Sequence, residues 1–197
     1  MDISKLKDQE LVNRFVKGEK YCMQELIKRH KDRVYTYILL IVKNTDVADD
    51  LFQDTFIKVI QSLKKRKYKD EGRFVSWVMR IAHNLTIDYF RKNKNQNTYS
   101  NDQGEFDMFN NAKFSDSTIE DNMITDQTTR DVRFLIDKLP KDQKQVVLMR
   151  HYGDMSFKEI AEQTGVSINT ALGRMRYALI NMRKFAEENN MQLANYS

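Results

Sequence analysis

The sequence predicts an all-α protein of two small helical domains joined by a flexible polar linker, with a helix-turn-helix in the C-terminal domain. Three observations lead to this prediction. Apolar residues recur at helical spacing over most of the chain, and one proline in 197 residues leaves long helices uninterrupted. The periodicity stops between Asn93 and Asp126, where Asn, Asp, Ser and Thr dominate. Between Leu139 and Lys184 a helix, a glycine turn and a capped helix follow one another.

A helix is expected at 129–138, and the C-terminal stretch that follows it carries start and stop signals for three more helices. Pro140 suits the first turn of the first helix, where its missing N–H costs nothing. Ser156 and Glu159 have the spacing of a capping box, in which each side chain satisfies a free backbone N–H at the start of the second helix. Gly165 marks the turn, and Ser167 is the expected cap of the third helix.

The third helix has an apolar face and a polar face. The apolar residues at helical spacing, expected to lie against the core, are Ile168, Ala171, Leu172, Met175, Leu179 and Met182. The polar face carries Asn169, Thr170, Gly173, Arg174, Arg176 and Tyr177. The two arginines can reach phosphates or guanine edges, which predicts DNA binding by a helix-turn-helix. The alternative is an ordinary three-helix bundle with a solvated basic face.

Four helices are expected before the linker, at about 8–17, 21–43, 46–63 and 73–92. Asn44 or Thr45 caps the third of these. Its apolar stripe is nearly continuous, and the acidic residues crowd its outer face. Acids near a helix N-terminus are favoured by the helix dipole, which could account for Asp50 but explains Asp54 less well. Gln53 lies between them, so this polar face is a candidate partner surface.

The fourth expected helix has a buried stripe and a polar side made of Arg80, Asn84, Asp88, Arg91 and Lys92. Trp77 is expected in the core, because it falls at helical spacing with its apolar neighbours, although it could also stack on a base. The basic connector at 64–73 is either a solvated loop or a contact to DNA backbone.

Composition excludes several classes of function. The net charge of +5 permits nucleic-acid binding without proving it, and the lone Cys22 rules out an intramolecular disulfide. The first residues have no apolar core of a signal peptide, and no apolar run is long enough to span a bilayer, so we expect a cytoplasmic protein without membrane insertion. No metal-ligand spacing, phosphate-binding loop or nucleophile motif is present, so we expect no cofactor, no metal and no enzymatic activity.

The C-terminal motif resembles region four of the sigma-70 family of bacterial transcription initiation factors. The pattern LPxxxxxVxxxxxxxxxSxxEIAxxxGxSxxTxxxRxxxA is carried by Leu139, Pro140, Val146, Ser156, Glu159, Ile160, Ala161, Gly165, Ser167, Thr170, Arg174 and Ala178. The resemblance implies that this domain reads the minus-thirty-five promoter element through Ser167, Asn169, Thr170, Gly173, Arg174, Arg176 and Tyr177. Leu172 departs from the family, which commonly has a lysine there, and this puts the promoter sequence in doubt.

Two N-terminal segments resemble region two of the extracytoplasmic-function (ECF) subfamily. DVADDLFQDTF is similar to the helix that docks on the clamp of core RNA polymerase, with Asp50, Gln53 and Asp54 at the matching polar positions. FxxWxxxIAxNxxxD, from Phe74 to Asp88, is similar to the helix that recognises the minus-ten element and holds a flipped base. The resemblance implies that Asn84 contacts a base, with Arg80, Asp88, Arg91 and Lys92 nearby.

These resemblances imply four segments: region two at 1–94, a flexible acidic linker at 95–128, region four at 129–188 and a frayed tail at 189–197. The implied function is promoter-specific initiation by an ECF sigma factor, with core RNA polymerase and promoter DNA as partners and an anti-sigma factor as a further one. The alternative function is a helix-turn-helix transcriptional regulator that acts without polymerase docking.

Overall fold

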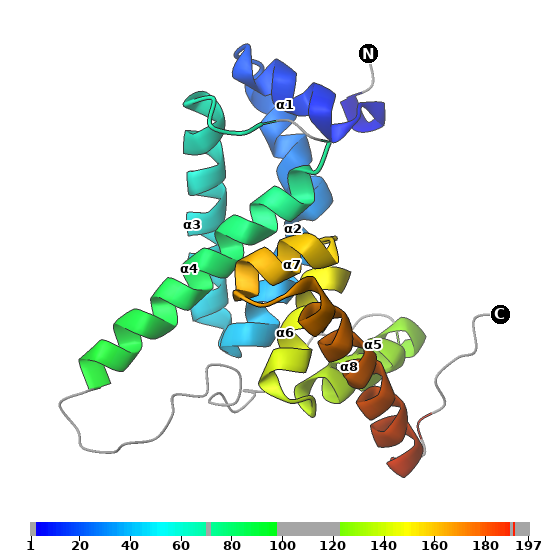
Figure 1. Cartoon of the computed structure of the whole chain (residues 1–197). Coiled ribbons are helices and arrows are strands. Elements are labelled where there is room, and N and C mark those ends of the chain that lie inside the picture. Colours follow the sequence, from blue (N-terminus) through cyan, green and yellow to red (C-terminus); the bar gives the residue numbers. More distant parts are fainter. Residues whose placement is uncertain (1–2, 70–71, 98–122, 190, 192–197) are drawn as a thin grey trace. The chain divides into compact units, whose positions relative to one another are not determined.

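The computed structural model describes residues 3–69, 72–97, 123–189 and 191, without the side chains of 94–97 and 123–129. Within these ranges every regular element is a helix, which confirms the predicted all-α class. The helices, labelled in Figure 1, form two compact units, α1 to α4 and α5 to α8. The polar linker predicted between them lies largely outside the described residues.

The first unit begins with the short 3-10 helix η1 (Ile3–Lys5) and contains α1 (Asp8–Val16), α2 (Lys20–Val42), α3 (Thr45–Lys64) and α4 (Phe74–Asn97). Helix α2 packs against α1, α3 and α4, and α3 packs against α4. The core side chains that are fully buried are Leu11, Leu26, Val34, Ile38, Val59, Val78, Met79 and Ala82. Burial of each large apolar side chain contributes about 1.5–3 kcal/mol, so this core holds the four helices together.

Helix α2 stops where its C-cap residue, Lys43, adopts a left-handed conformation at φ 53°. The next residue, Asn44, caps α3: its side-chain oxygen accepts a hydrogen bond from the backbone N–H of Val47 at 3.0 Å. Of the two caps considered from sequence, the structure therefore selects Asn44, and Thr45 is the first residue of the helix.

One side chain of α2, Arg29, fastens the N-terminal segment of the first unit. Its guanidinium donates to the backbone carbonyls of Leu6 at 2.6 Å and Ser4 at 2.8 Å, and to the Asp8 carboxylate at 3.0 Å. His30 Nε2 lies 2.7 Å from the other oxygen of Asp8. The hydrogen bond from His30, followed by the pairing with Arg29, holds the pKa of Asp8 below its ordinary value.

The second unit contains α5 (Met123–Asp137), α6 (Lys141–His151), α7 (Phe157–Thr164) and α8 (Ile168–Glu188), with α8 packed on the other three. Its fully buried side chains include Leu135, Val146, Leu148, Met149, Ile160, Ala171 and Ala178. Lys144 is also buried, and its ammonium pairs with the Asp137 carboxylate across the α5–α6 turn. The pairing offsets the cost of burying a charge.

Two helices extend beyond the limits predicted from sequence. We expected the fourth helix to end at Lys92 and the helix before Pro140 to begin at Thr129, but α4 continues to Asn97 and α5 begins at Met123. The α4 extension, 93–97, is polar throughout, and the only apolar residues of the α5 extension, Met123 and Ile124, are adjacent, so neither extension shows apolar helical periodicity. The predicted linker at 95–128 is therefore helical at both described ends, while its middle and most of the predicted tail lie outside the described residues.

Candidate nucleic-acid and partner interfaces

Helix α3 presents a compact polar face. Asp50, Gln53 and Asp54 are all exposed, and their spacing of three and four residues makes them neighbours on one side of the helix. Asp49 differs, because it lies against Tyr35, whose pKa is raised by burial and by this carboxylate. Ile57 follows one turn after Asp54 and is 50% exposed. The face thus combines carboxylates, an amide and an apolar side chain, a mixture suited to a protein partner.

The buried side of helix α4 determines where the predicted minus-ten residues lie. Phe74, Val75, Val78, Met79, Ala82 and Leu85 are buried, so this side of the helix lies against the core. Arg80, Asn84, Asp88 and Arg91 then form one stripe, because they follow one another at intervals of four, four and three residues. Asn84 is exposed at the middle of this stripe.

At the end of the stripe, Asp88 and Arg91 form an exposed ion pair at 3.7 Å. Lys92 is exposed as well but lies further round the helix. The structure therefore brings four of the five predicted minus-ten residues into one line, and it places Lys92 beside that line.

Aromatic side chains gather where the basic connector meets α4. The Tyr68 ring lies 4.5 Å from that of Trp77 and 6.1 Å from that of Phe74, measured between centroids. Trp77 and Tyr68 are half-buried, and the flanking lysines and Arg66 are exposed. Trp77 packs among apolar neighbours, as the helical spacing predicted, and the connector is anchored at Tyr68 while its basic side chains remain in solvent.

The predicted caps of the helix-turn-helix are present. Ser156 and Glu159 form a capping box, with the Ser156 backbone N–H donating to the Glu159 carboxylate at 2.9 Å and the Glu159 N–H donating to Ser156 Oγ at 3.3 Å. Gly165 ends α7 in a left-handed conformation at φ 68°. Ser167 caps α8 by accepting from the Thr170 N–H at 3.1 Å.

The outer face of α8 differs from the face predicted at Gly173, which is half-buried, and at Arg174. Asn169, Thr170, Arg176 and Tyr177 are exposed, with Tyr177 at 62%. Arg174 lies elsewhere: its guanidinium pairs with the Asp142 carboxylate of α6. On the same side, Asn181 donates to Gln143 of α6 at 2.8 Å. From the sequence we placed Arg174 on the polar outer face. In the structure Arg174 and Asn181 contact α6, because both lie on the side of α8 that is next to its buried residues.

The expected apolar face of α8 is corrected more strongly. Ala171, Ala178 and Ala186 are its buried residues, whereas Ile168, Leu172 and Leu179 are 44–46% exposed. Alanines allow α8 to approach its neighbours closely, so only a narrow strip is covered and the larger apolar side chains remain at its edge. The spacing was helical, as predicted, but it did not show which residues of the stripe lie inside.

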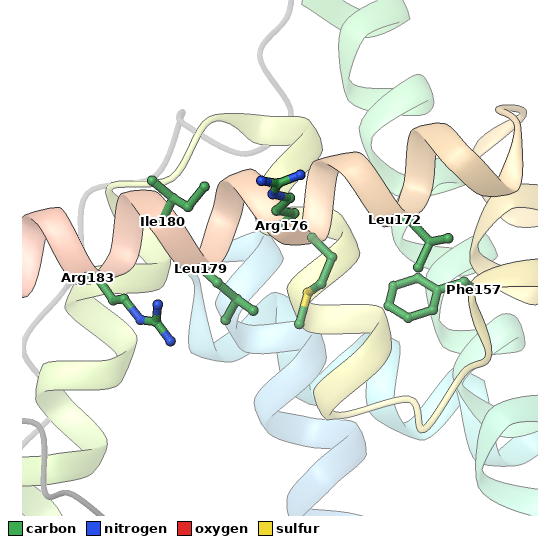
Figure 2. Close-up of a pocket in the computed structure, with 7 residues that line it drawn as sticks. Phe157, Leu172, Arg176, Leu179, Ile180 and Arg183 are labelled. Carbon is green, nitrogen blue, oxygen red and sulfur yellow. The ribbon is translucent and has the colours of Figure 1, made fainter.

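The exposed apolar residues of α8 border a groove of about 500 Å³ beside α7. Figure 2 shows Leu172 close to Phe157, with Arg176, Leu179, Ile180 and Arg183 following along the helix. The lining is largely apolar, and its two arginines place positive charge along the groove. Sequence reasoning missed this groove and Ile57. Both could have been found from the sequence, because each involves large apolar residues on a helix whose core-facing stripe is already complete without them.

Among the described residues, His, Cys, Asp and Glu form no group of three that could hold a metal ion. Within the same residues, no helix combines the length and apolar character needed to cross a membrane.

The two units thus define a helical DNA-binding protein with one helix-turn-helix. Sequence models sharpen this class, because Sigma-70 region 2 matches residues 26–96 and Sigma-70 region 4 matches residues 129–176. The ECF RNA polymerase sigma-E factor of Haemophilus influenzae is 28% identical over 174 residues, which are 86% of this chain and 90% of that protein. The sigma factor CarQ of Myxococcus xanthus is 27% identical, covering 93% of this chain and 99% of CarQ.

The fold also matches solved structures. The sigma factor RpoE of Bartonella quintana, solved in complex with the anti-sigma factor NepR, has a TM-score of 0.64 at 17% identity and covers 83% of this chain and 96% of that one. CnrH, solved in complex with the cytosolic domain of CnrY, has a TM-score of 0.61 at 19% identity, over 93% of this chain and 99% of CnrH. These likenesses concern the fold.

The chain belongs to the sigma-70 family, in its ECF subfamily. It acts with RNA polymerase to direct promoter-specific transcription initiation. Proteins of this family are initiation factors rather than enzymes. The alternative of a regulator that acts without polymerase docking is not favoured, because the matches cover both regions and not the helix-turn-helix alone.

Proposed function

We propose that three surfaces divide the work of initiation: the polar face of α3 docks on core polymerase, the stripe on α4 reads the opened minus-ten strand, and the outer face of α8 reads the minus-thirty-five element. The observation that carries this division is that each surface is exposed on a helix whose opposite side is buried.

For the docking surface, the proposed residues are Asp50, Gln53 and Asp54, with Ile57 as an apolar contact beside them. Charged residues at an interface set specificity and association rate, and a partly exposed apolar side chain adds buried area. We expect the surface of core polymerase that contacts this acidic face to be basic or neutral.

For the promoter surfaces, an amide offers a donor and an acceptor to a base edge, which suits Asn84 at the centre of the α4 stripe. Arg80, Arg91 and Lys92 supply positive charge near it, and Asp88 holds Arg91 in place by an ion pair. On α8 the proposed residues are Ser167, Asn169, Thr170, Gly173, Arg176 and Tyr177. Arg174 joins them only if its ion pair with Asp142 opens on DNA.

The division is tested by exchanging charges and amides in full-length protein. Asp54→Arg is expected to weaken association with core polymerase, measured by fluorescence anisotropy, while the melting temperature stays near wild type. Asp32→Arg is the matched control, because Asp32 is an exposed acid on a different helix, α2. Unchanged association of Asp54→Arg would remove the proposed docking surface.

The same assay series separates docking from strand opening. Asn84→Ala is expected to bind core polymerase normally and to reduce permanganate reactivity of thymines in the open complex on a promoter selected by the wild-type holoenzyme. Asn13→Ala, an exposed amide on α1, is the control. Equal thymine reactivity in Asn84→Ala would exclude the role of this residue on the opened strand.

We also propose that the α8 groove takes an amphipathic helix with acidic residues from a protein partner such as an anti-sigma factor. Phe157, Leu172 and Leu179 would receive the apolar side of that helix, and Arg176 and Arg183 its carboxylates. A labelled amphipathic peptide with glutamate flanks is expected to bind wild type but not Leu179→Asp. Equal binding of a peptide with lysine flanks would contradict the proposed charge pairing.

A further inference from the structure

A buried hydrogen bond joins α2 to α4 directly beside the proposed base-reading residue. Tyr37 of α2 is completely buried and His83 of α4 is 3% exposed. The Tyr37 hydroxyl lies 2.9 Å from His83 Nδ1, and the two rings meet at an interplanar angle of 63°. Asn84 is the next residue along α4 and is exposed.

The chemistry of the pair fixes the direction of the bond. Burial raises the pKa of Tyr37, and burial lowers the pKa of His83 to about 4. At neutral pH the phenol keeps its proton and the imidazole is neutral, so the hydroxyl donates and Nδ1 accepts. The proton of the neutral ring then resides on Nε2.

The bond adds something that the surrounding core cannot supply. Apolar contacts between α2 and α4 are non-directional, so they oppose separation of the helices more strongly than a small rotation of α4 about its axis. A hydrogen bond weakens steeply as its angle departs from linear, so it resists such a rotation. Any rotation at His83 would be passed to Asn84 and to the rest of the α4 stripe.

We infer that Tyr37 and His83 are positioning residues, whose hydrogen bond sets the rotation of α4 and thereby aims Asn84 at its base. The inference rests on the proposed role of Asn84. The alternative is that the pair only stabilises the first unit, in which case any replacement that restores stability should also restore function.

Four variants separate positioning from stability. Tyr37→Phe removes one hydroxyl and leaves Nδ1 without its donor. Tyr37→Phe combined with His83→Leu removes both polar groups, and replacing both partners of a buried hydrogen bond by apolar groups can be nearly neutral for stability. His83→Asn keeps an acceptor oxygen near the position of Nδ1. Asn84→Ala removes the proposed base contact itself.

Stability is followed by the fluorescence of Trp77, the chain's one tryptophan, which lies in α4. We expect Tyr37→Phe to lose both stability and open-complex formation. The double apolar variant should recover the melting temperature. It should nevertheless form at least about fivefold fewer open complexes than wild type, which is the lower end of the discrimination that a good contact to a base edge provides. His83→Asn should retain open-complex formation, and core binding should be unchanged throughout.

The decisive outcome is the double apolar variant. Wild-type open-complex formation by that variant would overturn the inference. So would a loss from Tyr37→Phe that is as large in Asn84→Ala as in wild type, because a positioning effect that acts mainly through Asn84 must shrink when Asn84 is absent. If the double apolar variant does not fold, the comparison of Tyr37→Phe with His83→Asn decides: equal losses by both overturn the inference. A normal open complex in Asn84→Ala alone would instead sink the proposed function.

Discussion

Helices α4 and α8 are both proposed to face DNA, but they are held in their domains in opposite ways. Helix α4 buries large side chains such as Met79 and Val78, and Asn84, Asp88 and Arg91 of its polar stripe are exposed. Helix α8 buries alanines and leaves Leu172, Leu179 and Ile180 at 44–47% exposure. The difference teaches that large apolar residues mark the core in one helix and border an exposed groove in the other.

The largest expected effect comes from truncating a large side chain in each helix. Met79→Ala should lower the free energy of unfolding by about 2–5 kcal/mol, because it leaves a cavity in the core of the first unit. Leu179→Ala, with nearly half of its surface already in water, should cost well under about 1 kcal/mol. Urea unfolding followed by Trp77 fluorescence reports the first variant, and hydrogen exchange reports the second. Similar costs for both would break the comparison.

The buried His83 of α4 should make the stability of the first unit depend on pH. Its pKa is about 4 in the folded chain and about 6.5 when unfolded, so below pH 6.5 the unfolded chain takes up a proton that the folded chain does not. Stability should therefore fall by up to about 3 kcal/mol as the pH drops from 7 to 4, and this contribution should level off below 4.

His83→Asn should flatten the dependence between pH 7 and 4, measured by urea unfolding at each pH. The lowered pKa of Asp8 acts in a separate window, because its stabilisation is lost only as the pH falls below its ordinary value of 3.8. An unchanged slope in His83→Asn would mean that another group titrates.

Enlarging a small residue of α8 should reverse the pattern of the first prediction. Ala178→Leu adds volume where α8 approaches its neighbours and should cost about 1–3 kcal/mol. Gly173→Ala, at a position with no atom within 4 Å of the added carbon, is the control and should be neutral or slightly stabilising. Hydrogen exchange of the second unit measures both, and a tolerated Ala178→Leu would show that the alanines do not set the packing distance.

The smallest expected effects distinguish the two arginines of α8. Arg174→Ala should lower the stability of the second unit by about 0.2–1 kcal/mol, as for other partly exposed ion pairs, without changing the salt dependence of promoter binding. Arg176→Ala should leave stability unchanged, with Arg183→Ala as the control. If Arg176 contacts a phosphate, the salt slope should fall by about one unit.

Promoter binding by reconstituted holoenzyme across a salt series gives the slopes. The phosphate contact predicted for Arg174 from sequence competes with its ion pair to Asp142, and a lower salt slope in Arg174→Ala would favour the phosphate contact. Side chains two residues apart on a helix diverge by about 200°. The structure agrees, because Arg174 pairs with α6 and Arg176 lines the groove.

Much of this fold could be predicted, because the signals were local. The capping box at Ser156, the left-handed Gly165 and the cap at Ser167 each involve residues within one turn, so the sequence contains the whole interaction. The α4 stripe was predictable for a related reason, since its buried side is made of large apolar residues at regular spacing.

The rest depended on contacts between elements. Whether Leu172 lies inside or outside is decided by how closely α7 approaches α8, and Arg174 is turned by a carboxylate on α6. The Tyr37–His83 bond joins residues 46 positions apart, and neither residue alone suggests it. Helix ends in polar sequence, such as Asn97, leave no apolar pattern to read.

The attachment of the N-terminal segment to α2 through Arg29 has a kinetic consequence. One guanidinium holds the carbonyls of Leu6 and Ser4 and the Asp8 carboxylate together, so these bonds can be lost in a single rotation of one side chain. The segment from Ile3 to Asp8 should accordingly detach as one cooperative piece, with a common opening rate. A lysine at position 29 has a single ammonium group and could not make all of these bonds at once. In Arg29→Lys the residues of the segment should therefore open at different rates.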